Sequence, residues 1–486
     1  MASDEKLLVE RIRHRVTAAI SGRTAISIEG SVRAVRGDGI TALVPAASVG
    51  EMASIERPMS PPVRCVVVGV EGNKAFLSPL DDTAGIAGGA AVQLSSARLH
   101  LSLQQKGLFQ MIDSMGDDIH QSDMHRCGIV EEPEKNLISV SPRWRVRNEQ
   151  EEVTISDVPA RLSEVVASEN PLARQRFETG IRSIDALCPL AEGQRVAVIA
   201  PPGCGKSTLL LQLAAQARYD VLVMALVGER RREIRECEGR LRRLVDQGRR
   251  AVVIAEPSDA SPMRRLLAGQ AAVATAEHFA SKGNRVLLVI DSLTRVARAM
   301  REVGLMRGEK IVRGGYTASV YTELPRLLER AGPHRGGVIT AFHSLLSHDE
   351  RDVDPLKEEV ISLLDGHIVL SESLARRGVY PAIHPTQSLS RLAGELEGGE
   401  ERRRRLAFLS GWERLERDRD TVLLGGRPDG ELKKLLQAEP LMTSFLSQAG
   451  GEVVSLQEGQ KSLLHVLGAM RGDNIASGGN RLRLAS

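Results

Sequence analysis

The 486-residue sequence predicts an α/β core, preceded by a small β-barrel and followed by a helical domain. Three changes of pattern along the chain support this fold class. Short strands with turn signals fill about residues 24–80, strands and helices alternate over 182–392, and only amphipathic helical patterns follow residue 394. We therefore expect three domains, at residues 1–95, 96–392 and 393–486.

The composition indicates a globular chain without a membrane span. Hydrophobic residues make up 42% and charged residues 26%, and the longest apolar runs have only the length of a strand. The net charge of +3 is too close to balance to indicate a polyanionic partner. Five cysteines without a Cys-x-x-Cys pair, and an N-terminus without a secretory apolar stretch, favour a cytoplasmic location.

The first domain is expected to be a small β-barrel. Residues 25–44 read as two strands joined by the turn Arg36-Gly37-Asp38-Gly39, and residues 63–80 read as two more. The glycine-rich stretch 85–89 is interpreted as a joint to the next region. Residues 100–147 carry only a weak pattern, and little regular structure is expected there.

The second domain opens with a phosphate-binding loop. An apolar strand, Val196–Ile199, runs into Ala200-Pro201-Pro202-Gly203-Cys204-Gly205-Lys206-Ser207-Thr208 and then into a helix. Glycines let the backbone amides turn toward phosphate oxygens, the lysine supplies a positive charge, and the serine hydroxyl can ligate Mg²⁺. Ala200 stands where the motif has its first glycine. The sequence predicts a nucleoside triphosphate site formed by Pro202, Gly203, Cys204, Gly205, Lys206, Ser207 and Thr208.

Two further strands end in carboxylates. The strand 285–290 delivers Asp291, which we expect to act on the metal side of the site. The strand 221–227 leads into Gly228-Glu229, and this extra strand between the other two in the chain is typical of a RecA-like core. Glu229 is the candidate that orients and activates the attacking water. Glu233, one helical turn further on, is the less favoured alternative.

Quoted together, these motifs resemble the type III secretion ATPases, which are relatives of the catalytic subunit of the rotary F-type ATP synthase. The similarity is dense from about Pro171 to Arg391 and looser elsewhere. Besides the loop, it rests on Val227-Gly228-Glu229-Arg230, Ile290-Asp291-Ser292-Leu293-Thr294-Arg295, Leu364-Asp365-Gly366-His367-Ile368-Val369-Leu370, Tyr380-Pro381-Ala382-Ile383 and Ser388-Leu389-Ser390-Arg391.

The resemblance implies a homohexameric ring with nucleotide between neighbouring subunits. It makes Arg391 an arginine finger that reaches into the neighbour's site, where a surface salt bridge is the alternative. It places Tyr380 on the adenine ring, where an ordinary core tyrosine is the alternative. By the same resemblance Arg230 helps to hold the network on the phosphate side.

Two residues raise separate questions. Arg231 occupies a place where the family usually has glycine, and a long cation beside Glu229 is expected to lower the pKa of that carboxyl group or to shift its rotamer. Cys204 lies at a helix N-terminus beside Lys206, which favours a reactive thiolate. The favoured alternative is that this loop position simply tolerates a small residue.

The function implied is that of an ATP- and Mg²⁺-dependent ring ATPase at the cytoplasmic face of the inner membrane. Such a ring couples hydrolysis to chaperone release, unfolding and export of secreted substrates. Expected partners are stator or stalk proteins, export gate proteins and chaperone–effector complexes. Within the family, the sequence Lys206-Ser207-Thr208-Leu209-Leu210 favours the injectisome over the flagellar branch.

Two other functional classes compete with this one. A non-catalytic ring subunit would lack a carboxylate at the position of Glu229. A Rho-like RNA translocase would need aromatic platforms in its barrel, and residues 24–80 contain only Phe76. The arginine-rich segments 230–243 and 402–405 are interleaved with glutamates in helical patterns, so no nucleic acid partner is expected.

Overall fold

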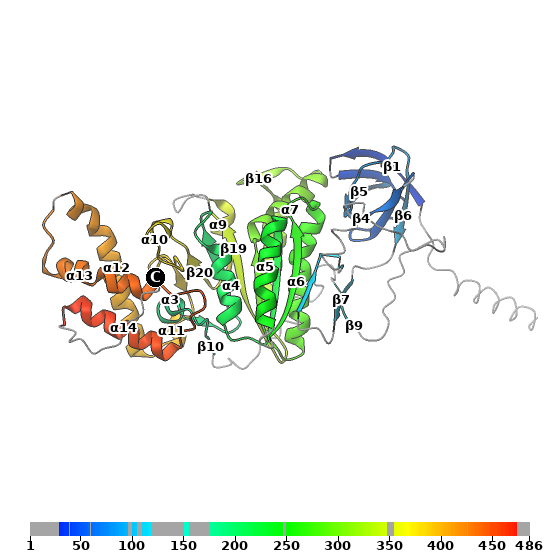
Figure 1. The fold of residues 1–486 in the computed structure, drawn as a ribbon. Helices are drawn as coiled ribbons and strands as arrows, with labels where there is room; N and C mark the ends of the chain where they lie inside the picture. Colours follow the sequence, from blue (N-terminus) through cyan, green and yellow to red (C-terminus); the bar gives the residue numbers. More distant parts are fainter. Residues whose placement is uncertain are drawn as a thin grey trace, which may run out of the picture. The chain divides into compact units, whose positions relative to one another are not determined.

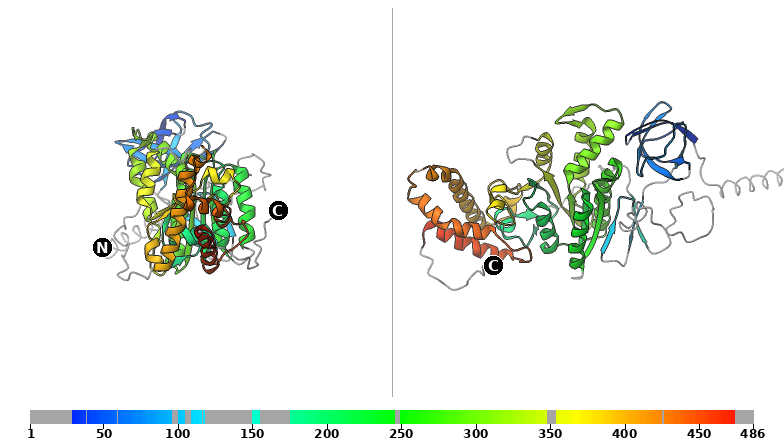
Figure 2. Two further views of the ribbon diagram at one scale, coloured as in Figure 1. Left: turned by 90° about the vertical axis from the view of Figure 1, so that its left-hand side faces the viewer. Right: turned by 45° about the horizontal axis from the view of Figure 1, so that its top comes forward.

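The structure, a computed structural model, describes residues 29–37, 39–58, 60–95, 100–104, 109–115, 117, 150–154, 175–245, 249–347, 354–424 and 426–473. The chain forms two compact units (Figures 1 and 2). One unit comprises residues up to Leu99 together with 261–263 and 302–309, and the other comprises the remainder. The predicted helical stretch at residues 5–20 lies outside the described residues.

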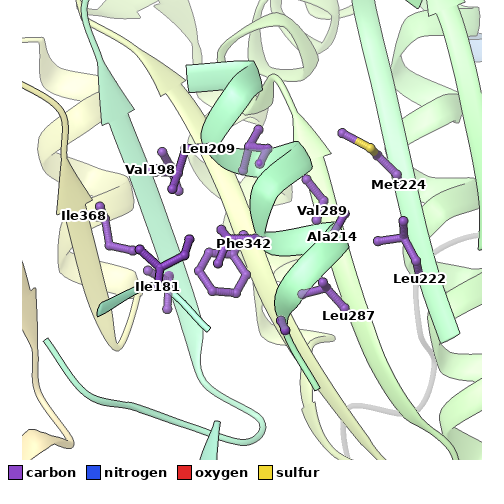
Figure 3. Close-up of a cluster of buried hydrophobic side chains, with 14 of the residues drawn as sticks. Ile181, Val198, Leu209, Ala214, Leu222, Met224, Leu287, Val289, Phe342 and Ile368 are labelled. Atoms are coloured by element: carbon purple, nitrogen blue, oxygen red, sulfur yellow. The ribbon is translucent and has the colours of Figure 1, made fainter. Parts of the chain in front are cut away.

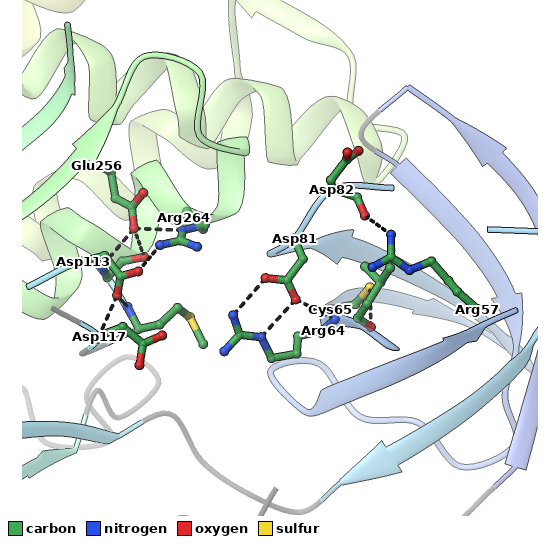
Figure 4. A network of polar contacts seen from close by, with 12 residues as sticks. Arg57, Arg64, Cys65, Asp81, Asp82, Asp113, Asp117, Glu256 and Arg264 are labelled. Atoms are coloured by element: carbon green, nitrogen blue, oxygen red, sulfur yellow. Dashed lines mark hydrogen bonds and ion pairs between the residues drawn. The ribbon is translucent and has the colours of Figure 1, made fainter. Parts of the chain in front are cut away.

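The first unit contains a small β-barrel, as predicted, and the barrel is closed by six strands. Its strands follow the order β1-β2-β5-β4-β3-β6, and alternate side chains such as Ile40, Ile55 and Leu77 point into a hydrophobic core. At the barrel surface, the Arg64 guanidinium donates two hydrogen bonds to the Asp81 carboxylate, at 3.0 and 2.8 Å (Figure 4). The strands are β1 (Glu29–Arg36), β2 (Gly39–Leu43), β3 (Met52–Arg57), β4 (Ser60–Glu71), β5 (Lys74–Pro79) and β6 (Ala91–Ser95).

The interpretation of residues 85–89 as a joint is wrong. The strand β6 follows this stretch and pairs with both β1 and β3, so the glycines form a loop within the barrel. The short strand Ala91–Ser95 has little pattern of its own, and its pairing with two distant strands is what makes it part of the barrel.

The second unit is built on a mostly parallel sheet. Its strand order is β21-β20-β12-β19-β15-β13-β14-β8, where β21 is antiparallel at the edge and β18 pairs antiparallel with β19. The strands are β8 (Phe109–Ile112), β12 (Arg195–Ala200), β13 (Val221–Glu229), β14 (Arg250–Pro257), β15 (Arg285–Asp291), β18 (Gly332–Pro333), β19 (Val338–Leu346), β20 (Gly366–Val369) and β21 (Leu389–Ser390).

Helices cover both faces of this sheet. On one face, Leu209 and Ala214 of the helix after β12 lie over Val198 and Phe342 (Figure 3). Every residue of β13 is buried, as expected of a parallel strand covered on both faces. The helices are α3 (Arg182–Leu187), α4 (Lys206–Gln216), α5 (Arg231–Val245), α6 (Pro262–Ser281), α7 (Leu293–Met306), α8 (Ala318–Glu329), α9 (Pro355–Leu363), α10 (Glu372–Arg376) and α11 (Ala393–Leu396).

The strand β8 corrects the expectation of little structure after residue 100. It extends the sheet beside β14, and the residues that follow it enter a buried polar cluster (Figure 4). Arg264, 5% exposed, pairs there with both Asp113 and Glu256, while the Ser114 hydroxyl donates to Glu256 at 2.6 Å. A short strand held by distant charges leaves almost no local signal in the sequence. Outside the sheet, β7 (His100–Gln104) pairs with β9 (Gln150–Thr154).

Three helices complete the second unit, as predicted, and pack around Phe408, Trp412 and Met442. They are α12 (Gly399–Leu423), α13 (Gly430–Leu446) and α14 (Leu456–Arg471). Asp429 caps α13, and Ser455 forms a capping box with Glu458 at the start of α14. Among the described helices, none combines the length and apolar content that a membrane crossing needs. The domain boundaries at 95/96 and 392/393 stay predictions.

The remaining short strands are β10 (Arg176–Phe177), β11 (Leu190–Ala191), β16 (Ile311–Arg313) and β17 (Tyr316–Thr317). They form two separate pairs, β10 with β11 and β16 with β17.

Candidate functional site

The predicted phosphate-binding loop connects β12 to α4. Gly203 and Gly205 have φ angles of 84° and 87°, in the left-handed region that glycine adopts without a steric cost. Gly205 is also the N-cap of α4, whose first turn carries no acidic side chain. The free amides and the positive end of the helix dipole are therefore available to an anion.

Lys206, Ser207 and Asp291 meet at this loop. The Lys206 Nζ lies 2.6 Å from Asp291 Oδ1, and the Ser207 hydroxyl donates to Asp291 Oδ2 at 3.4 Å. Asp291 is 1% exposed and also accepts a hydrogen bond from the Ser344 hydroxyl at 2.6 Å. Sequence reasoning missed Ser344, because it lies inside the apolar strand β19 and only the sheet order brings it beside Asp291.

Glu229 lies at the same edge of the sheet as Asp291. The two strands are parallel neighbours with Leu226 opposite Asp291, so the chain continues three residues further before it reaches Glu229. In space β19 lies between β12 and β15, and β13 lies on the far side of β15. The carboxyl ends of all these strands face one edge, which is where α/β sheets bind ligands.

The environment of Glu229 holds a proton near neutral pH. Burial, a hydrogen bond with Glu233 and the charge of Asp291 together raise the pKa of Glu229 to about 7. The charges of Arg295 and Lys206 act in the opposite direction. The hydrogen bond with Glu229 lowers the pKa of Glu233, so the proton shared by the two carboxyl groups resides mainly on Glu229.

The cation beside Glu229 is Arg295, and the expectation for Arg231 is wrong. Arg295 Nη2 lies 3.3 Å from Glu229 Oε2, whereas Arg231 pairs with Asp259 at 3.0 Å. Gly228 makes room for this contact, because a Cβ there would lie 2.8 Å from Arg295 Cδ. The sequence motif after Asp291 contains Arg295 but predicts no role for it. Its sequence distance from Glu229 gave no indication that the two meet.

The Glu229–Glu233 contact predicts a shift in the pH dependence of hydrolysis. Glu229 must be ionised to act as a base toward the attacking water, so the rate of ATP hydrolysis is expected to rise with pH through about 7. Glu233→Gln removes one cause of the raised pKa, and the acid limb of the rate profile should move to lower pH. Steady-state rates between pH 5.5 and 8.5, about a unit and a half on either side, measure it. An unmoved or alkaline-shifted limb contradicts the contact.

Tyr380 lies against the phosphate-binding loop. A Cβ built on Gly205 would be 3.6 Å from Tyr380 Cε1, and the tyrosine is 45% exposed. This is the exposure of a surface ring rather than of a core tyrosine. The backbone carbonyl of Tyr380 accepts a hydrogen bond from Gln448 N at 2.8 Å. This bond fixes the backbone of Tyr380 to the segment that follows α13. An exposed aromatic face beside the loop is suited to stacking on a planar base.

Arg391 lies far from this chain's own loop. Ser390 is opposite Gly366, which is in register with Val196 near the start of β12, whereas the loop follows the other end of that strand. The guanidinium donates to the carbonyls of Ile361 and Ser362, at 3.2 and 3.4 Å. Within the described residues, Arg391 forms no ion pair with a carboxylate. Its exposed position leaves a role in a neighbouring subunit's site open.

Arg230 and Cys204 are placed differently from one another. Arg230 is exposed at the start of α5, where its backbone N–H donates to Glu233 at 3.4 Å. Cys204 is 2% exposed and packs in the core cluster with Leu210 and Ile368. This burial favours the interpretation of Cys204 as a tolerated small residue. The four described cysteines, Cys65, Cys188, Cys204 and Cys237, form no disulfide.

A RecA-like sheet with a P-loop, and with two carboxylates at the edge where the loop lies, defines a P-loop nucleotide hydrolase. The ATP synthase alpha/beta family, nucleotide-binding domain, matches residues 180–390. The chain belongs to the family of type III secretion and flagellar export ATPases, and it is accordingly an ATPase.

Relatives and solved structures match along nearly the whole chain. The Type 3 secretion system ATPase of Pseudomonas syringae pv. tomato is 35% identical, covering 92% of this chain and 96% of the relative. The Flagellum-specific ATP synthase of Bacillus subtilis is 32% identical, covering 90% and 95%. The assembled ATPase EscN of the enteropathogenic E. coli type III secretion system superposes with a TM-score of 0.76 at 30% identity, covering 90% of this chain and all of EscN.

Proposed function

We propose that this chain works as a homohexameric ring ATPase of a type III protein secretion apparatus. Its hydrolysis of ATP would drive the release of substrates from chaperones, their unfolding and their export. The observation that carries the proposal is the gathering of Lys206, Asp291 and Glu229 at one edge of the sheet. The match to a Type 3 secretion system ATPase along 92% of the chain supports the injectisome. Flagellar export is the second candidate, supported by flagellum-specific relatives.

In the proposed reaction each described side chain has one task. Lys206 leaves Asp291 and binds the terminal phosphates, which the backbone N–H groups of residues 203–208 also cradle. Glu229, held by Arg295, orients the water that attacks the γ-phosphate. Tyr380 stacks on the adenine ring, and Arg230 supports the network on the phosphate side.

The residues at the loop fit a magnesium ion. Mg²⁺ prefers oxygen ligands and needs only one or two from the protein, and the hydroxyl of Ser207 and the carboxylate of Asp291 are of this kind. The two groups already approach each other at 3.4 Å. When bound, Mg²⁺ neutralises charge on the phosphates.

The site is proposed to be complete only between two subunits. Arg391 is too far from its own loop and would act on the phosphate bound by a neighbour. The solved EscN structures are of an assembled ATPase and of its complex with the central stalk EscO. We extend ring and stalk partners, export gate proteins and chaperone–effector complexes to this chain, at the cytoplasmic face of the inner membrane. No nucleic acid partner is proposed.

Arg391→Ala tests the composite site. In assembled rings the rate of hydrolysis is expected to fall by about 10³-fold or more, because an arginine finger neutralises charge on the γ-phosphoryl group. Rates of separated monomer and ring fractions are the measurement, with Arg402→Ala on α12 as the matched arginine control. A monomer rate that falls as much as the ring rate contradicts a role in trans.

A further inference from the structure

Arg391 is held at two places, one for its backbone and one for its side chain. Its backbone N–H donates to the carbonyl of Asp365 at 2.9 Å. Its guanidinium donates to carbonyls in the last turn of α9, those of Ile361 and Ser362. The C-terminal end of a helix carries partial negative charge, so it attracts a guanidinium. The exposed side chain of Arg391 is thus held at the end of α9, and the backbone of Arg391 is held by the Asp365 carbonyl.

The Asp365 carboxylate is itself fixed to the base of the P-loop strand. Asp365 Oδ2 accepts from the backbone N–H of Arg195 at 3.0 Å and from its Nε at 3.1 Å, and Oδ1 accepts from Nη2 at 3.2 Å. This is a two-point fork of an arginine on a carboxylate, which fixes geometry as well as charge. Asp365 N–H also donates to the Arg195 carbonyl at 3.0 Å, so the two residues are joined in both directions.

A second bridge crosses the same point. Gln194 Nε2 donates to the Asp365 carbonyl at 2.9 Å and to the Ser390 hydroxyl at 3.1 Å. The Asp365 carbonyl therefore accepts from both Gln194 and Arg391. Because β12 begins at Arg195 and ends at the phosphate-binding loop, this junction links the strand of one active site to the arginine proposed for the next.

We propose that Asp365 is a positioning residue for Arg391, and that it sets where the arginine finger stands relative to its own P-loop strand. This inference rests on the proposed action of Arg391 in a neighbouring site. Asp365 lies directly before β20, level with the start of β12, and so does not reach the nucleotide site of its own chain. Its effect on hydrolysis is exerted through Arg391, and a displacement of about 1 Å is enough to cost roughly a hundredfold in rate.

The test uses rings assembled from two kinds of subunit. Asp365→Ala should leave ATP affinity unchanged, measured by calorimetry, while ring turnover falls by roughly tenfold or more. Glu229→Gln supplies subunits that have an intact finger but a disabled site of their own. In a 1:1 mixture about a quarter of the sites join an intact Glu229 to an intact finger, because a head-to-tail ring pairs each site with one neighbour. The mixture should therefore exceed the mean rate of the two separate samples.

A parallel mixture of Arg391→Ala with Glu229→Gln distinguishes the positioning role of Asp365 from the action of Arg391 in a neighbouring site. Rescue of Arg391→Ala but not of Asp365→Ala overturns the positioning role and leaves the finger in place. Rescue of neither variant means that Arg391 does not act in trans, and the positioning role falls with it. Rescue of both supports the proposal.

Two further variants test the same contact in case Asp365→Ala fails to fold. Arg195→Lys retains the charge but cannot form the fork on Asp365, so it should behave as Asp365→Ala does and be rescued by the same partner. Glu329→Gln is the matched control, since Glu329 pairs with Arg195 at 2.6 Å and has no bond to the Asp365–Arg391 junction. A loss of ring turnover in Glu329→Gln as large as in Arg195→Lys overturns the assignment to Asp365.

Discussion

Lys206→Ala is expected to weaken ATP binding by about 10- to 100-fold, the loss of one hydrogen bond to a charged group worth roughly 1.5–3 kcal/mol. Lys206 belongs to the loop itself, and Asp291, 1% exposed, is its ion-pair partner. The variant loses the phosphate contact, and it also leaves a buried carboxylate without its positive charge. Turnover should fall further than affinity, because charge on the phosphates grows during the reaction.

Isothermal titration calorimetry with a non-hydrolysable ATP analogue measures the affinity directly. Lys433→Ala, on the exposed face of α13, is the matched lysine control and should bind as the unmodified chain does. An unchanged dissociation constant for Lys206→Ala contradicts the assignment of the phosphate-binding loop.

Glu229→Gln is expected to bind ATP normally and to lose about 10²- to 10⁴-fold in turnover, the usual contribution of a positioned general base. Glutamine has the shape of glutamate, so the contact with Arg295 keeps its geometry while the carboxylate charge is lost. Phosphate release under saturating ATP is the measurement.

Glu233→Gln is the matched variant for this prediction, because Glu233 shares a proton with Glu229 and lies one helical turn away. It should retain turnover above neutral pH. If Glu233→Gln is the inactive variant and Glu229→Gln releases phosphate at a near-normal rate, the catalytic carboxylate is Glu233.

The sequence predicts those site residues that lie in the loop directly after a single apolar strand. The phosphate-binding loop, Asp291 and Glu229 each follow an apolar run, and parallel strands bring such ends to one edge. The three C-terminal helices were predictable for a similar reason, since their 3.6-residue periodicity is local.

The contacts that tune the site could not be read from the sequence. Ser344 reaches Asp291 only because β19 lies beside β15, and Arg295 reaches Glu229 only because α7 follows the strand next to β13. Strand order is a long-range property, which neither spacing nor composition contains. The expectation for Arg231 is wrong for the same reason, because Arg231 forms an ion pair with Asp259 in the turn after β14.

The strands missed or misread are β8, at the edge of the large sheet, and β6, which closes the barrel between β1 and β3. The short strands β8 and β6 have a weak pattern, and each gains its place from partners more than thirty residues away in sequence. The Asp113–Arg264–Glu256 cluster fixes the residues after β8 through charges that the sequence does not pair. The domain boundaries and the roles of Tyr380, Arg230 and Arg391 stay predictions.

The most direct test of a site shared between subunits is the rate of ATP hydrolysis per subunit across a series of protein concentrations, with the oligomeric state measured by mass in the same samples. We expect the rate to rise steeply as rings form, because each phosphate-binding loop then gains an arginine from its neighbour. A rate per subunit that stays constant from monomer to ring contradicts the composite site.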